Sequence, residues 1–157
     1  MTTARKDGLA LSSSKGFTLI ELLVVIGILA VLLAIVLIAI NPARQFSQAN
    51  NTKRRSDVNA ILNAVHQYAA DNKGALPAGV TETDQEITST AANLCSDLVT
   101  QYLAALPVDP LTNNGTPITD CTAAYTTGYN IIKSATDNRL TVSAPDAELS
   151  EVINVVR

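Results

Sequence analysis

The sequence is poor in the residues on which metal and catalytic sites depend. Its 157 residues include one histidine, two cysteines and no tryptophan, and aromatic residues make up only 4%. No group of His, Cys and carboxylate residues has the spacing of a metal or nucleophilic centre, so we expect no metal, no cofactor and no catalysis. Charged residues amount to 16% and the net charge is −3, which implies no broad basic surface for nucleic acid. The length fits one compact domain with at most an appendage, which argues against a multidomain enzyme.

The apolar residues are concentrated in one segment. Residues 22–40 form an unbroken run, LLVVIGILAVLLAIVLIAI, and the chain after it is rich in Ala, Thr, Asn and Ser. A helix over residues 17–40 would be about 36 Å long, enough to cross an apolar layer about 30 Å thick. Arg5, Lys6 and Lys15 precede the run, and a basic flank favours the cytoplasmic side. No small-residue cleavage site follows, as it would in an ordinary secretory signal. The sequence predicts a membrane segment joined to an exported domain.

Glu21 is the only acidic residue of this apolar helix. An ionised carboxylate inside an apolar layer costs about 2.5–3.5 kcal/mol on insertion-based scales, so it needs water or a partner. Two interpretations follow. Glu21 either stays wet at the headgroup level near the cytoplasmic end, or pairs with a cation from another chain.

The residues around Glu21 form a specific motif. The segment KGFTLIELLVVIGILA, which starts at Lys15, resembles the signature of type IV pilins and type II secretion pseudopilins. The resemblance implies cleavage after Gly16 by prepilin peptidase, methylation of the new N-terminal residue Phe17, and a role for Glu21 in filament assembly. Lys15 would hold the scissile bond at the cytoplasmic face. The α-amine freed on Phe17 is a cation at neutral pH, and it can neutralise Glu21 of a neighbouring chain.

The resemblance implies a structural subunit rather than an enzyme. It divides the chain into a leader (1–16), a transmembrane and filament-core helix (17–40) and an exported head (41–157). Expected partners are further copies of the chain, prepilin peptidase/N-methyltransferase, the pilus assembly platform with its ATPase, and the membrane. The expected location is the inner membrane, N-terminus cytoplasmic, and then an extracellular filament for motility, adhesion or DNA uptake. Two alternatives stay open: a type II secretion pseudopilin, and a membrane-anchored binding domain that never polymerises.

The polar part of the chain is predicted to form a pilin-like α+β head. Asn41-Pro42 marks a break and restart of the helix, because Pro42 suits a first helical position. The second helical pattern runs from about Ala43 to Asn72 and stops at Lys73-Gly74. The remaining expectations are a polar loop at 79–90, a helix at 91–105 with Leu94, Cys95, Leu98, Val99, Tyr102 and Leu103 inward, and an antiparallel sheet of three strands at 125–133, 139–144 and 149–156.

Three smaller features of the head each allow two interpretations. Cys95 and Cys121 lie on the exported side, where they either form a disulfide or remain buried thiols. The cluster Lys53-Arg54-Arg55 is either a patch for DNA or another subunit, or a solvated helix face that pairs with nearby acids; the second is favoured. Asp109 and Asp120 lie in a turn-rich region and provide too few oxygens for calcium, so a plain surface loop is favoured. His66 is expected on the helix surface.

Overall fold

A computed structural model describes residues 16–157 and divides at Asn41 into two units, an apolar helix and a compact head. In the first unit, α1 spans Leu19–Ile40 and buries no side chain. Among the described residues it is the one helix long and apolar enough to cross a membrane, judged by length and composition. Its 22 residues correspond to about 33 Å.

The head begins with α2, Pro42–Asp71. The predicted break is confirmed: Asn41 adopts a left-handed conformation with φ of 47°, and Pro42 begins α2 because a first helical residue needs no N–H donor. The stop is confirmed as well, since Lys73 and Gly74 both have positive φ. The amide of Gly74 donates to the carbonyl oxygen of Ala69 at 2.7 Å and closes the last turn.

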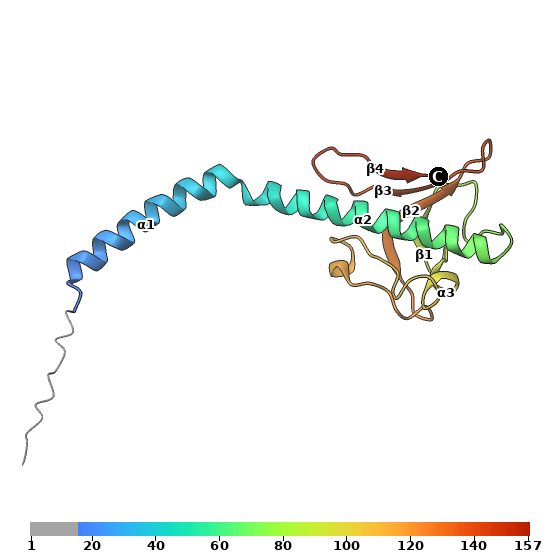
Figure 1. The fold of residues 1–157 in the computed structure, drawn as a ribbon, viewed down its shortest axis with the longest axis horizontal. Coiled ribbons are helices and arrows are strands. Elements are labelled where there is room, and N and C mark those ends of the chain that lie inside the picture. The colour runs from blue at the N-terminus through green and yellow to red at the C-terminus, as the bar shows by residue number, and fades with distance from the viewer. Residues whose placement is uncertain (1–15) are drawn as a thin grey trace, which may run out of the picture. The chain divides into compact units, whose positions relative to one another are not determined.

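The head's sheet has four antiparallel strands in the order β1-β2-β3-β4, not the predicted three (Figure 1). The additional strand β1, Gln85–Thr88, lies in the segment expected to be a polar loop and pairs with β2, Thr126–Lys133. The sequence did not predict this strand because only Ile87 of its four residues is apolar. The side chain of Ile87 is fully buried. β3 is Leu140–Ala144 and β4 is Ile153–Val156.

Two predicted elements are shorter than expected. The helix predicted over 91–105 is reduced to α3, Cys95–Leu98, because Val99 is extended and Thr100 has φ of 74°. The strand predicted from Leu149 begins only at Ile153, because Leu149 and Ser150 also have positive φ and belong to a turn. The inward residues were nevertheless predicted correctly: Leu94, Cys95, Leu98 and Val99 are buried, and Tyr102 and Leu103 pack against the core.

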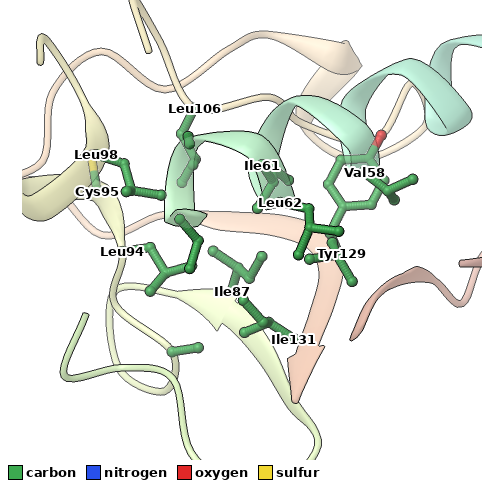
Figure 2. Packing of buried hydrophobic residues seen from close by; sticks show 14 of the residues in the cluster. Val58, Ile61, Leu62, Ile87, Leu94, Cys95, Leu98, Leu106, Tyr129 and Ile131 are labelled. Atoms are coloured by element: carbon green, nitrogen blue, oxygen red, sulfur yellow. The ribbon is translucent and has the colours of Figure 1, made fainter. Parts of the chain in front are cut away.

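The core lies between α2 and one face of the sheet. Val58, Ile61 and Leu62 of α2 belong to this core, and Figure 2 shows Leu62 above Ile87 of β1 and Ile131 of β2, Val58 beside Tyr129, and Leu94 and Leu98 at one side. Cys95 takes part in this core and is bonded to Cys121, with the two Cα atoms 5.4 Å apart. The disulfide therefore fastens the segment before β2 to α3.

Candidate processing and assembly site

The start of α1 is fixed by a reciprocal pair of contacts between Thr18 and Glu21. The amide of Glu21 donates to the hydroxyl of Thr18 at 3.2 Å, while Oε2 of Glu21 accepts bonds from the amide and the hydroxyl of Thr18, both at 2.8 Å. This arrangement is a capping box, which satisfies amides that a helix start leaves unpaired. The signal for it, Thr-x-x-Glu, is present in the sequence, and the sequence-based interpretation missed the role of Thr18.

Capping at Thr18 leaves the predicted cleavage position outside the helix. Gly16 and Phe17 precede α1 and are exposed, Phe17 to 91%. A Cβ placed on Gly16 would meet no atom within 4 Å, so the neighbouring structure does not explain the glycine. Lys15 and the leader residues that precede it lie outside the described residues.

Glu21 is a carboxylate on an otherwise apolar surface. The side chains around it on α1, among them Ile20, Leu22 and Val24, are all more than half exposed. A helix that is apolar on every side requires lipid or other apolar helices around it. The capping contacts hold the carboxylate at the first turn, against the amide and hydroxyl of Thr18. Glu21 thus presents a single anionic group at the start of an apolar helix.

The same segment matches a known family model, which describes the prokaryotic N-terminal methylation motif, over residues 11–37. The protein is prepilin-like. This motif is a prepilin-type cleavage and methylation signal, typical of type IV pilins and type II secretion pseudopilins. The fold agrees with it: a long N-terminal apolar helix followed by a head with a further helix and an antiparallel sheet is a pilin-like α+β architecture. No curated protein and no solved structure matches the chain significantly.

The motif carries three further implications for the prepilin-like chain. It implies processing by prepilin peptidase, and together with the apolar helix it indicates anchoring in the inner membrane before any assembly. Pilin-like proteins are generally structural rather than enzymatic. The part of the chain from residue 16 onward contains no group of three or more His, Cys, Asp or Glu residues that could hold a metal ion.

The head has its own polar centre, built around Arg54 on α2. The guanidinium of Arg54 is fully buried and donates from Nε to Asp109 Oδ2 at 2.6 Å and from Nη2 to Asp109 Oδ1 at 3.1 Å. Its Nη1 donates to Glu148 at 2.9 Å and to the side-chain oxygen of Asn51 at 3.0 Å. Hydrogen bonding to Asp109 is the main cause that raises the pKa of Arg54. One arginine thus connects α2 to two segments distant in sequence.

Glu148 anchors the connection between β3 and β4 to α2. Its carboxylate accepts bonds from Asn50 and from Ser47, both at 2.8 Å, in addition to the bond from Arg54. These contacts lower the pKa of Glu148, with the Asn50 bond as the largest cause. The backbone of Glu148 also bonds to Asn51 in both directions. The connection is therefore held along the N-terminal half of α2, where Figure 1 shows it beside the helix.

The structure corrects the favoured interpretation of the basic cluster at Arg54 and agrees with it at Arg55, which is exposed and pairs with an acid. Arg54 is neither on a solvated face nor available for DNA, because it is buried and paired. Lys53 donates to the carbonyl oxygens of Val108 and Gly115, and Arg55 pairs with Glu151 at the surface. The three charges therefore have three separate structural roles, and the sequence could not distinguish them because the partners lie far along the chain.

Asp109 and Asp120, the two carboxylates of the predicted loop, also accept hydrogen bonds within the head. Asp109 is buried against Arg54, which corrects the expectation of a plain surface loop at that residue. Asp120 accepts bonds from the amide and the hydroxyl of Thr122 and lies on the surface. His66 is half-buried rather than on the surface, and its Nε2 is a buried atom without a hydrogen-bond partner among the described residues.

Proposed function

We propose that the chain is the structural subunit of a type IV pilus. Prepilin peptidase cleaves it between Gly16 and Phe17 and methylates the amine of Phe17, and the subunit then polymerises into an extracellular filament. Residues 1–16 serve as the cytoplasmic leader, 17–40 as the transmembrane and filament-core helix, and 41–157 as the exported head. Motility, adhesion or DNA uptake would be the work of the filament. The methylation motif at residues 11–37 supports the processing steps.

The observation that carries the assembly step is the placement of Glu21. It lies on a helix whose remaining side chains are apolar and exposed, and Thr18 directs its carboxylate toward the helix start. An ionised carboxylate is costly among apolar helices unless a cation accompanies it. Cleavage supplies such a cation, because a free α-amine is protonated at neutral pH and a methyl group does not remove its charge. The amine of an incoming subunit thus neutralises Glu21 of a neighbour and sets the register between them.

Intact-mass measurement of surface-sheared filaments tests the processing. We expect a chain that begins at Phe17 and carries one added methyl group. A full-length chain in the filaments would refute cleavage after Gly16. Absence of the chain from filaments, combined with a loss of protein secretion on deletion of the gene, would identify a type II secretion pseudopilin instead. Absence from filaments without a secretion defect would favour an anchored binding domain.

A matched pair of variants tests the role of Glu21. Glu21→Gln keeps the size and the hydrogen-bonding oxygen but removes the charge, so we expect cleaved subunits that remain in the membrane and form few filaments. The control variant, Glu82→Gln, removes a carboxylate from the head surface, where Oε1 of Glu82 lies 3.8 Å from Nζ of Lys133. It should leave the filament yield unchanged. If the Glu21→Gln chain polymerises as well as the Glu82→Gln chain, charge pairing does not drive assembly.

A further inference from the structure

The two phenylalanines of the chain differ from its four tyrosines. Tyr125 and Tyr129 are buried in the head. Tyr68 and Tyr102 pack edge to face with ring centroids 5.9 Å apart. Phe17 and Phe46, by contrast, are 91% and 71% exposed. They flank α1 in the sequence, Phe17 two residues before its first residue and Phe46 six residues after its last.

The length of the chain between α1 and Phe46 restricts where the ring can lie. Ile40 ends a helix of about 33 Å, which matches an apolar layer of about 30 Å bounded by headgroup layers of roughly 5–8 Å. Pro42 to Phe46 is helical, so these residues span only about 6 Å. At any angle between α1 and α2, Phe46 therefore stays close to the end of the span. Side chains on a helix also tilt toward its N-terminus, which directs the ring back along the chain.

The first part of α2 is exposed in the head. Residues 42–46 are all exposed, and Ser47, which follows them, donates to Glu148 of the head. Aromatic and aliphatic side chains of helices that lie at a membrane surface are buried at the boundary between headgroups and acyl chains. Because α1 adjoins these residues, a lipid surface lies next to them even before a second copy of the chain binds.

We propose that residues 42–46 form a membrane-interface anchor, in which the ring of Phe46 inserts among the lipid headgroups and upper acyl chains on the head side of the bilayer. The anchor rests on the proposed membrane-spanning role of α1. It holds the unassembled subunit at a fixed depth, with α1 fully inserted and the head at the surface. Its partner is the phospholipid bilayer itself, and extraction into a filament must release it.

The absence of tryptophan allows a direct test by single-tryptophan fluorescence. Three variants of the full chain are reconstituted in phosphatidylcholine vesicles whose acyl chains carry bromine at a shallow or a deep position. Phe46→Trp reports on the anchor, Leu29→Trp on the middle of α1, and Ala135→Trp on the exposed turn between β2 and β3. Bromine quenches tryptophan only at close range. Formation of the Cys95–Cys121 disulfide in each variant verifies that the head is folded.

We expect the fluorescence of Phe46→Trp to be quenched by shallow bromine at least roughly twofold more than by deep bromine, with the opposite order for Leu29→Trp and no quenching of Ala135→Trp. Quenching of Phe46→Trp no greater than that of Ala135→Trp would overturn the anchor. The anchor would also be overturned if the emission of Phe46→Trp were blue-shifted but unquenched and the shift increased with the protein-to-lipid ratio. The tryptophan would then be covered by a second copy of the chain. If Leu29→Trp is also unquenched, α1 does not span the bilayer, and the proposed anchoring of the whole subunit fails with it.

Discussion

Arg54 and Asp109 form a two-bonded ion pair in the interior of the head, 2.6 and 3.1 Å long, in which neither side chain is exposed to solvent. The pair joins α2 to the loop that precedes β2, across 55 positions of sequence. Close by, Tyr129 of β2 donates its hydroxyl hydrogen to Asp57 of α2 at 2.8 Å. Polar contacts of Arg54 and Asp57 thus accompany the apolar core on α2.

Removing the guanidinium should destabilise the head strongly. Arg54→Met leaves Asp109 buried without a cation, and breaking a buried pair on one side costs about 3–5 kcal/mol. Arg55→Met provides the matched control, because Arg55 is about half exposed, pairs with Glu151 at the surface and should cost less than about 1 kcal/mol. Urea unfolding of the detergent-solubilised chain measures both. Equal midpoints for the two variants would show that the buried pair contributes no more than a surface one.

The acid sensitivity of the head should depend on Glu148 and Asp57 in opposite directions. The pKa of Glu148 is lowered in the folded state, so its contribution to stability is present above its ordinary pKa and is lost as the pH falls toward the folded value. Burial raises the pKa of Asp57, so its cost to stability is present at neutral pH and disappears as the pH falls through that raised value.

Replacing each carboxylate by its uncharged amide measures the direction of its effect on stability. Between neutral pH and about pH 3, a range that includes the ordinary carboxyl pKa, Glu148→Gln should make the decline in unfolding free energy shallower and Asp57→Asn should make it steeper. Asparagine retains an oxygen that can accept the bond from Tyr129, which keeps the comparison close. Urea midpoints measured across the pH series provide the slopes. A shallower decline in both variants would contradict the role assigned to Asp57.

The disulfide should contribute a substantial part of the head's stability. Cys95 and Cys121 are separated by 26 positions, and closing a loop of this size contributes about 3–4 kcal/mol in the chain-entropy model. We expect a reducing agent to lower the urea midpoint of the wild-type chain to that of the Cys95→Ser/Cys121→Ser variant. The variant itself should not respond to the reducing agent. A wild-type midpoint that does not change although free thiols are detected would show that the bridge adds little.

The cap at the start of α1 should be detectable by hydrogen exchange. Thr18→Val preserves the shape but removes the hydroxyl that accepts from the amide of Glu21, at a cost of about 1 kcal/mol, or about fivefold faster exchange of that amide. Thr18→Ser keeps the hydroxyl and should exchange as the wild type does. NMR of the chain in micelles resolves the amide. Unchanged protection in the valine variant would mean that the micelle, rather than Thr18, fixes the first turn.

Several features could be predicted because their causes are local in sequence. The apolar run predicts α1, and Asn41-Pro42 and Lys73-Gly74 set the bounds of α2 through backbone preferences of the residues themselves. The motif around Gly16, Phe17 and Glu21 is continuous, so one segment suffices to recognise it. The inward residues from Leu94 to Leu103 were found by their spacing, even though only Cys95 and Leu98 among them lie within α3.

Other features depend on partners that no local pattern reveals. β1 contains a single apolar residue, and it becomes a strand because β2 offers a free edge and the core a place for Ile87. The three consecutive cations Lys53, Arg54 and Arg55 look alike in the sequence and receive different surroundings only after folding. The turn at Leu149 and Ser150 follows from the contacts that fix Glu148 to α2, although the sequence there favours a longer strand.

The sequence by itself determined that this chain carries a prepilin-type methylation motif, an apolar helix and a polar head, because hydrophobic runs, helix breakers and a contiguous motif act over a few neighbouring residues. Only the tertiary structure decided which arginine is buried, that the two cysteines are joined, and that a fourth strand completes the sheet. Each of those outcomes is settled by the free energy of contacts between segments 26 to 94 positions apart, which folding alone brings together.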